Sequence, residues 1–201
     1  MKKYELTAEF IEKWGKKLFR IKALISFGSV EVGELGGYVE KEDNLEQDGD
    51  AWVCGNAKVY GNAKVYGNAE VYGNAEVCGN AEVCGNARVC GNAKVYGNAE
   101  VCGDARVCGD ARVCGNADYL LIGRIGSRFS FTTFFKNKDK GITVSCGCFL
   151  GTIAEFRAKV TDTHGNNKHA KIYNLAADMA ELQILGEEYF DKLNTNKSEP
   201  F

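Results

Sequence analysis

Histidine is nearly absent from this chain. The two that occur, His164 and His169, both lie in its last quarter. The imidazole side chain is the usual general base near neutral pH and a common zinc ligand. We therefore expect neither histidine-based catalysis nor a histidine-based zinc site in the long N-terminal part of the chain.

Long apolar runs are absent as well. Lys2 and Lys3 are not followed by a hydrophobic segment, and no stretch is long enough to span a bilayer, so neither a signal peptide nor a membrane anchor is predicted. We expect a cytoplasmic protein whose nine cysteines are thiols and not a disulfide framework. The net charge of −2 gives no overall field that would favour a nucleic acid as partner.

What the chain has in abundance is a six-residue repeat, V-[YC]-G-[ND]-A-x, which runs eleven times without interruption from Val53 to Asp118. Valine at position one and alanine at position five are an even number of residues apart, so in an extended segment they can face the same side. Glycine followed by asparagine or aspartate favours a corner, because these residues tolerate positive φ best. Each hexad therefore predicts one flat side and one corner, and three hexads predict a triangular coil.

This pattern resembles the left-handed parallel β-helix built from hexapeptide repeats, in which position one is aliphatic and position five is small. The resemblance implies a mainly β fold with a solenoid over residues 35–118. The inward positions extend backwards from the strict repeat through Ala51, Leu45, Val39 and Leu35. Cysteines three hexads apart should stack on neighbouring coils, where oxidation could cross-link them, as in the pairs Cys84–Cys102 and Cys90–Cys108.

Residues 1–34 are predicted to form an α/β cap, because the end of a solenoid exposes unpaired strand edges and an open core. Thr7 is the expected start of a short helix that ends at Gly15 and carries Phe10, Ile11 and Trp14 on one face. Residues 18–25 alternate as a strand does. Three aromatic side chains are expected to plug the core: Trp14, Phe19 and Phe27.

Residues 119–185 have a different composition and are predicted to form a C-terminal ββαα module, followed by a polar tail at 186–201. Residues 128–135 and 142–146 are typical of a β-hairpin. Thr152 and Glu155 form a capping-box signature before one helix, which should end near His164. Asn167 can cap a second helix, whose apolar positions with helical spacing are Ile172, Leu175, Ala176, Met179 and Leu182.

The best-known enzymes of the resembling fold are acyltransferases with a catalytic histidine, and carbonic anhydrases of this fold hold zinc with several histidines. The solenoid here has no histidine, and no loop interrupts its strict hexads, so we predict no catalysis and no cofactor. A metal site built from Cys146, Cys148, His164 and His169 and a nucleophilic pair of Cys148 with a histidine stay as alternatives. Their spacing fits no standard zinc pattern, so we favour core packing for the cysteines and a helix C-terminal role for His164.

Position two of the hexad alternates with the inward valine, so its side chains should face outward. They form rows of cysteine and of four tyrosines, Tyr60, Tyr66, Tyr72 and Tyr96. These rows either pack along their own ladders or form a protein interface, since tyrosine is enriched in interfaces. A set of basic residues after the solenoid is either a contact for an anionic partner or a solvated hairpin: Arg124, Arg128, Lys136, Lys138 and Lys140.

Position six carries most of the charge of the solenoid. Two of its rows alternate in sign, which favours ladder stabilisation over binding. The third is the only acidic row and contains Glu82, Glu100 and Asp118. The segment 40–50 is also acidic, and it is either a solvated corner or a site for a basic partner.

The hexad array joined to the segments Gly147–Thr152 (GCFLGT) and Thr163–Lys168 (THGNNK) resembles a group of small bacteriophage and prophage proteins. The resemblance implies a phage or prophage setting, in which small accessory proteins often block host factors. We therefore predict a non-catalytic binding protein that sterically occludes a host protein, for example one of CRISPR-type antiviral defence, in the host bacterial cytoplasm, with homo-oligomerisation possible. Two alternatives stay open: a protein that sequesters a small anionic nucleotide between subunits, and an acyltransferase-like enzyme whose base is His164 or comes from another subunit.

Overall fold

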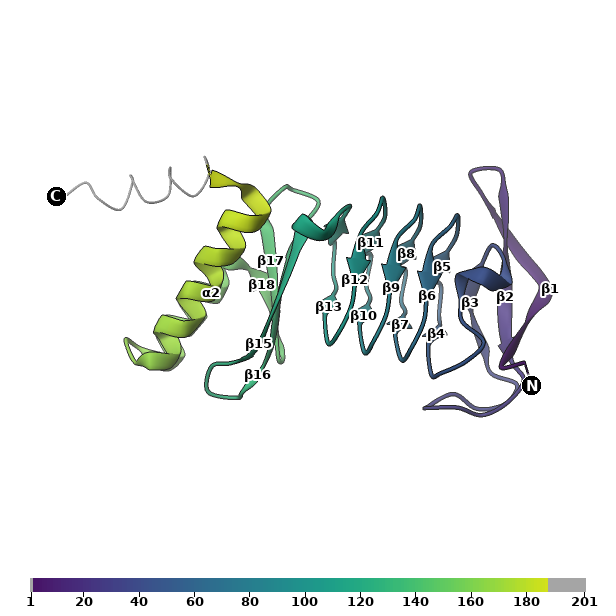
Figure 1. Ribbon diagram of the computed structural model, residues 1–201, viewed down its shortest axis with the longest axis horizontal. Helices are drawn as coiled ribbons and strands as arrows, with labels where there is room; N and C mark the ends of the chain where they lie inside the picture. The colour runs from purple at the N-terminus through teal and green to yellow at the C-terminus, as the bar shows by residue number, and fades with distance from the viewer. Residues whose placement is uncertain (1, 188–201) are drawn as a thin grey trace. The chain divides into compact units, whose positions relative to one another are not determined.

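The computed structural model describes residues 2–187, and Figure 1 shows its elements in chain order. The tail predicted at 186–201 lies outside the described residues except for Gly186 and Glu187. The chain divides into two compact units, Met1–Asn116 and Ala117–Phe201. Neither helix in the described part combines the length and the apolar composition needed to cross a membrane.

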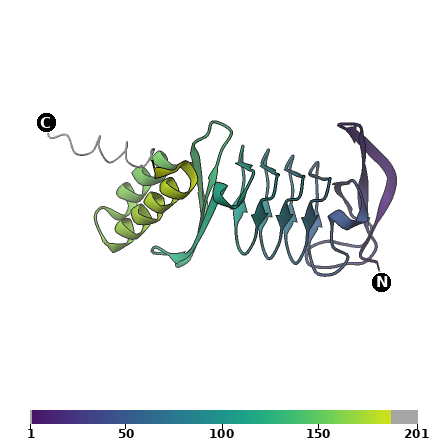
Figure 2. The ribbon, with the colours of Figure 1, turned by 45° about the horizontal axis from the view of Figure 1, so that its top comes forward.

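Stacked coils of short parallel strands fill most of the first unit, so the predicted parallel β-solenoid is confirmed (Figures 1 and 2). The strands form three ladders, β3-β5-β8-β11-β14, β4-β7-β10-β13 and β6-β9-β12. Successive strands of a ladder pair in register across one coil, as Glu76 does with Lys94 and Lys94 with Arg112. The strands are β3 (Leu35–Val39), β4 (Trp52–Val53), β5 (Lys58–Val59), β6 (Lys64–Val65), β7 (Glu70–Val71), β8 (Glu76–Val77), β9 (Glu82–Val83), β10 (Arg88–Val89), β11 (Lys94–Val95), β12 (Glu100–Val101), β13 (Arg106–Val107) and β14 (Arg112–Val113).

The core of the solenoid consists of the two residue types that the hexad repeats. Every valine of position one from Val53 to Val113 is fully buried, and the alanines of position five from Ala57 to Ala111 are buried as well. Each valine packs on the valines of the coils before and after it, as Val83 does between Val65 and Val101. The stacking therefore builds one continuous apolar column from units that could not bury their own faces alone.

The corners are set by glycine and by asparagine. Gly91 adopts φ +70°, and a Cβ there would lie 2.9 Å from the backbone nitrogen of Gly109 on the next coil. The asparagines that follow form amide ladders up the corners, for example from Asn62 Nδ2 to Asn80 Oδ1 (3.1 Å) and from Asn80 Nδ2 to Asn98 Oδ1 (3.0 Å). Glycine is thus required both by its backbone conformation and by the closeness of the next coil.

A β-hairpin caps the N-terminal end of the solenoid. It consists of β1 (Tyr4–Lys13) and β2 (Lys16–Ala23), and β2 pairs with β3, so the hairpin extends one ladder. The helix predicted from Thr7 to Gly15 is wrong, because residues 7–13 lie in β1 and the last two form the hairpin turn. The turn uses Trp14 and Gly15 at φ 52° and 74°, and two consecutive residues at positive φ are typical of a tight hairpin turn. The strand predicted over residues 18–25 corresponds to β2.

The plug of the core differs from the predicted one. Trp14 is 83% exposed at the hairpin tip, so its predicted role as a plug is wrong. Phe27 packs edge-on against Trp52 at 5.4 Å between ring centroids, whereas Phe19 contacts Phe10 instead. The buried groups at this end include Tyr4, whose Oη donates to the carbonyl oxygen of Leu45 (2.7 Å), and η1 (Glu42–Asn44) lies beside it.

The second unit is an antiparallel sheet with two helices. Strands β15 (Tyr119–Ile125), β16 (Ser130–Lys136), β17 (Ile142–Cys146) and β18 (Phe149–Thr152) pair in chain order. Helices α1 (Ile153–His164) and α2 (Lys168–Leu185) follow and lie side by side (Figure 2), and η2 (Asn116–Asp118) precedes β15. The predicted hairpin and both helix caps, Thr152 and Asn167, are confirmed. The predicted order ββαα was incomplete, because it lacked two strands of the observed sheet, β15 and β18.

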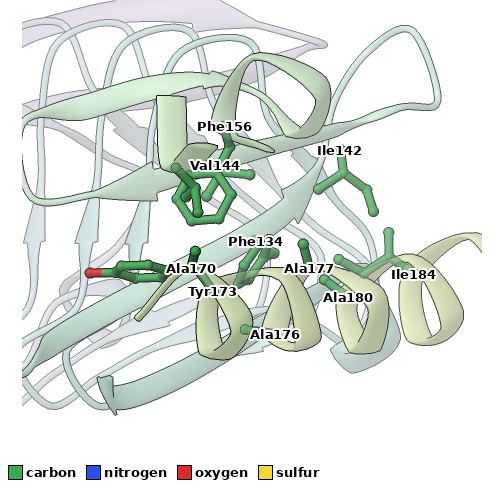
Figure 3. Packing of buried hydrophobic residues seen from close by; sticks show 11 residues of the cluster. Phe134, Ile142, Val144, Phe156, Ala170, Tyr173, Ala176, Ala177, Ala180 and Ile184 are labelled. Atoms are coloured by element: carbon green, nitrogen blue, oxygen red, sulfur yellow. The ribbon is translucent and has the colours of Figure 1, made fainter. Parts of the chain in front are cut away.

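The core of this unit forms where both helices meet the sheet. Figure 3 shows Phe134 and Val144 of the sheet with Phe156 of α1 and several residues of α2. Phe156 contacts the rings of both Phe134 and Tyr173 edge-on, at 5.8 and 5.6 Å between centroids. Alanines supply much of the α2 contribution, which lets this helix lie close to the sheet: Ala170, Ala176, Ala177 and Ala180.

Candidate binding surfaces

The four tyrosines of position two are half-buried on the solenoid. Tyr60 Oη donates to Glu76 Oε2 (3.4 Å), and Tyr66 Oη donates to Glu82 Oε2 (2.9 Å). Tyr72 and Tyr96 occupy the equivalent positions in their own hexads. Two of the four hydroxyls therefore form hydrogen bonds within the solenoid, which agrees with the alternative that these rows pack along their own ladders.

The environment of Tyr66 predicts a loss of stability at alkaline pH. Its hydrogen bond to Glu82, together with burial, raises the pKa of Tyr66 to about 12. An unfolded tyrosine ionises near pH 10, so the stabilisation is complete below about pH 10 and is lost as the pH rises through the folded value. We expect the stability difference between wild type and Tyr66→Phe, measured by urea unfolding, to fall between about pH 10 and 12. A difference that stays constant over this range would contradict the assignment.

The cysteines of position two stack as the repeat predicts, and four of them are joined. Disulfides link Cys84 with Cys102 and Cys90 with Cys108, whose Cα atoms are 4.7 and 4.6 Å apart. The expectation that all nine cysteines are thiols is therefore wrong for these four, because stacking brings their backbones within disulfide range. Five cysteines take part in neither disulfide: Cys54, Cys78, Cys114, Cys146 and Cys148.

The stacking register also predicts which cysteines can be oxidised. Cys78 has Tyr60 and Tyr96 as its neighbours on adjacent coils, so it cannot pair within its row. We expect peptide mapping of the oxidised monomer to find only the links 84–102 and 90–108, and complete reduction to release four additional thiols. An intramolecular link to Cys78 would show that the register is wrong.

The charged rows of position six form mostly opposite-sign neighbours. Arg88 pairs with Glu70 at 3.2 Å, and Glu76 lies between Lys58 and Lys94 in its ladder. Three neighbour pairs carry like charges. Two of them are basic, Arg88–Arg106 and Lys94–Arg112, and the third, Glu82–Glu100, is acidic. These rows agree with ladder stabilisation on two sides and leave one acidic side.

A hollow of about 850 Å³ lies beside the N-terminal end of the acidic side. Glu42, Glu46 and Glu82 line it together with Tyr66. All three carboxylates have partners already. Glu42 pairs with Lys2 (2.7 Å), Glu46 accepts from the backbone nitrogen of Gly67 (3.1 Å), and Glu82 accepts from Tyr66 Oη (2.9 Å). The hollow is therefore a solvated acidic surface without a converging set of ligands.

The five basic residues proposed as an anionic contact fall into two groups. Arg124 and Arg128 lie in β15 and in the turn after it, whereas the lysines lie at the far end of β16 and beyond. A strand of this length separates the groups by roughly 20 Å. Lys136 forms an ion pair with Asp118 at 3.0 Å, and Lys138 and Lys140 are exposed. The structure thus divides the predicted patch.

The candidate metal ligands of the second unit do not converge. Cys146 Sγ accepts a hydrogen bond from Thr132 Oγ1 (3.2 Å), and Cys148 is exposed in the following turn. His164 ends α1, with its ring 5.8 Å from that of Tyr173 and 5.9 Å from that of His169. Within residues 2–187, one group of three potential ligands comes close together, Cys84, Glu100 and Cys102, and its two cysteines share a disulfide.

Several of these residues do share a cavity of about 340 Å³ within the second unit. Cys146, Cys148 and His164 line it, as do Arg128 and Tyr173. Burial raises the pKa of Tyr173, and Cys146 adds to the effect. No sequence pattern indicated this cavity, because its walls come from segments far apart in the chain.

Helix α2 leaves an apolar stripe uncovered. Ile172, Leu175, Met179 and Leu182 are 37%, 63%, 58% and 45% exposed, although their helical spacing is that of a buried face. The face that does pack on the sheet lies beside this stripe and is made of the small residues described above, with Tyr173 and Ile184. Exposed patches of several large apolar side chains are typical of interaction surfaces.

Comparison of the sequence with protein-family models and with curated proteins finds no match. What can be said of function therefore rests on the residues and their arrangement.

Proposed function

We propose that this chain is a non-catalytic binding protein of the phage or prophage type, built on a left-handed hexapeptide-repeat solenoid. It would act in the cytoplasm of a bacterial host by covering a surface of one host protein, with antiviral defence proteins of the CRISPR type as the target class. The observation that carries the binding role is the exposed apolar stripe of α2. The phage setting rests on the resemblance of the hexad array and its C-terminal module.

The stripe favours a helix as the surface that it contacts. Ile172, Leu175, Met179 and Leu182 follow one another at intervals of three, four and three residues, which is the spacing of a two-helix seam. Lys168 and Lys171 are exposed at the basic N-terminal end of the same helix. We therefore expect the target to present an amphipathic helix with acidic residues near that end.

The solenoid supplies bulk and rigidity in this proposal. Its buried valine column and inter-coil hydrogen bonds form regular sides, and no inserted loop interrupts the coils between Trp52 and Val113. A rigid body attached to a small contact surface blocks access to a target by volume, without a reaction. The rows that contain Tyr60, Tyr66, Tyr72 and Tyr96 would then be secondary contacts.

The test is capture of a host protein by the tagged full chain, followed by reconstitution with the purified target. Leu175→Glu should abolish a stoichiometric complex, because it places a charge in the centre of the stripe, and Leu175 is exposed enough for the fold to tolerate it. Ala154→Glu is the matched control, since it adds the same charge to an exposed position of α1. Hydrogen exchange should show α2 protected in the complex.

Two results would overturn the proposal. One is a complex that Leu175→Glu and Ala154→Glu leave equally intact, which would place the interface elsewhere. The other is self-association through the stripe, seen by light scattering as a dimer that Leu175→Glu converts to a monomer. In that case α2 is covered by a second copy of this chain and not by a host protein.

A further inference from the structure

The cavity of about 340 Å³ in the second unit has the size of a small-ligand site. It lies between α1 and the two turns that join β15 to β16 and β17 to β18. All of its walls belong to one compact unit, so its shape does not depend on the solenoid. This cavity is independent of the exposed α2 stripe on which the proposed function rests.

Aromatic side chains form the apolar part of the cavity. Phe149, Phe156 and Tyr173 line it together with Val160. The rings of Phe149 and Phe156 are tilted at 5.6 Å between centroids, and Phe156 meets Tyr173 edge-on at the same distance. In Figure 3 the Tyr173 hydroxyl points away from the α2 alanines. Rings arranged in this way offer faces and edges on which a flat aromatic ligand can pack.

The polar part of the cavity is cationic. Arg128, Lys159 and His164 are among the lining residues, whereas no aspartate or glutamate within residues 2–187 is. Lys159 already pairs with Asp162 at 3.0 Å, but Arg128 forms no ion pair with any carboxylate in the described part of the chain. A guanidinium without a carboxylate partner beside an apolar cavity is suited to bind a carboxylate through two parallel hydrogen bonds.

The backbone around Arg128 keeps room for this group. Arg128 lies between Gly126 at φ +72° and Phe129 at φ +47°, in a turn whose conformation few non-glycine residues adopt. A Cβ on Gly147, which has φ +61°, would lie 3.0 Å from Arg128 Nη1, so the glycine leaves space for the guanidinium. The β15–β16 turn and the β17–β18 turn together thus set the position of the Arg128 guanidinium.

We propose that this cavity binds a small aromatic carboxylate, with its ring among Phe149, Phe156 and Tyr173 and its carboxylate on Arg128. The apolar walls provide the affinity for the ring, and the Arg128 guanidinium, which has no carboxylate partner among residues 2–187, selects the anion. Binding is reversible and involves no covalent step. The chemical class follows from three aromatic walls and from Arg128. Within the described residues, Arg128 has no carboxylate partner and the cavity lining has no acidic side chain.

The experiment is a calorimetric titration of the full chain with 1-naphthoate, with 1-naphthylmethanol as the uncharged match. We expect saturable naphthoate binding that Arg128→Gln weakens about tenfold, while binding of the alcohol is unchanged. Arg124→Gln is the matched control, because Arg124 is an exposed arginine of the same unit outside the cavity lining. Thr163→Trp, an exposed helix position at the cavity wall, should fill the space and abolish both interactions.

Three outcomes would overturn the proposal. These are no saturable binding of naphthoate at millimolar concentration, equal affinities of wild type and Arg128→Gln, and equal affinities of Arg128→Gln and Arg124→Gln. Leu175→Glu should bind naphthoate as wild type does, so failure of this cavity and failure of the protein-binding proposal are seen separately. Melting of each variant, recorded beside the titration, shows that lost binding does not reflect a lost fold.

Discussion

Replacing Val83 by aspartate is expected to destabilise the solenoid by more than about 4 kcal/mol, because it buries a carboxylate without a partner. Val83 is fully buried in the middle strand of the ladder β6-β9-β12, between Val65 and Val101. No water reaches this position to solvate the charge. Urea unfolding followed by tryptophan fluorescence measures the effect, since both tryptophans, Trp14 and Trp52, lie in the first unit.

Asn98→Asp is the matched control for this change. It also introduces an aspartate into the coils, but at an exposed corner where the amide of Asn80 can donate to it. Asp104 and Asp110 already occupy the same corner position at the end of their own columns. We expect Asn98→Asp to stay within about 0.5 kcal/mol of wild type. A Val83→Asp protein with wild-type stability would refute the register of the entire solenoid.

Gly126→Ala should strongly destabilise the second unit and leave the solenoid intact. Gly126 has φ +72°, and a methyl group there would overlap the hydroxyl and ring of Tyr173, which is itself part of the core. Backbone strain and overpacking together are expected to cost about 3 kcal/mol or more. The far-UV helical signal reports on this unit, because both α-helices of the described chain belong to it, while tryptophan fluorescence reports on the first unit.

A second glycine separates the two contributions. Gly165 also has positive φ, at +55°, but a Cβ there meets nothing within 4 Å. Gly165→Ala should therefore cost only the backbone strain, on the order of 1–3 kcal/mol. If Gly126→Ala were no more destabilising than Gly165→Ala, Tyr173 would not pack against this turn as described.

The solenoid could be predicted from the sequence because its coils repeat one local rule. Valine and alanine at fixed spacing specify the inward face, glycine specifies the corner, and neighbours along the ladder follow by counting. The hexads alone are therefore sufficient to predict the parallel ladders and the stacking of Cys84 on Cys102. The oxidation state of that pair was not predictable from spacing alone, since it depends on backbone distances.

The two ends of the solenoid lacked such a rule. In the segment from Thr7 to Gly15, apolar residues at positions 10, 11 and 14 suit a helix, but the hairpin pairing with β2 overrides that local preference. The turn at Trp14 and Gly15 was the available signal for a hairpin. Strands β15 and β18 were missed because they are defined by pairing with β16 and β17 and not by a local pattern of their own.

The candidate sites depend on tertiary contacts in the same way. The apolar stripe of α2 was visible as a pattern, but the sequence could not show that alanines and Tyr173 take the buried face and leave Leu175 exposed. The cavity places Arg128, which follows β15, beside residues of α1, which follows β18. Such proximities come from packing between elements and not from spacing along the chain.

Because each strand pairs with the strand one coil further along the chain, the solenoid can be lengthened or shortened only in steps of whole coils. Adding or removing one coil of 18 residues returns every valine, glycine and asparagine to an equivalent neighbour, as the in-register pairing across that separation shows. Each step moves the ends of the solenoid by about 4.8 Å, the spacing of paired strands, without a new kind of contact. Duplication or deletion of an 18-residue segment of the gene product can therefore adjust the length of the solenoid, while the cap and the C-terminal unit stay the same.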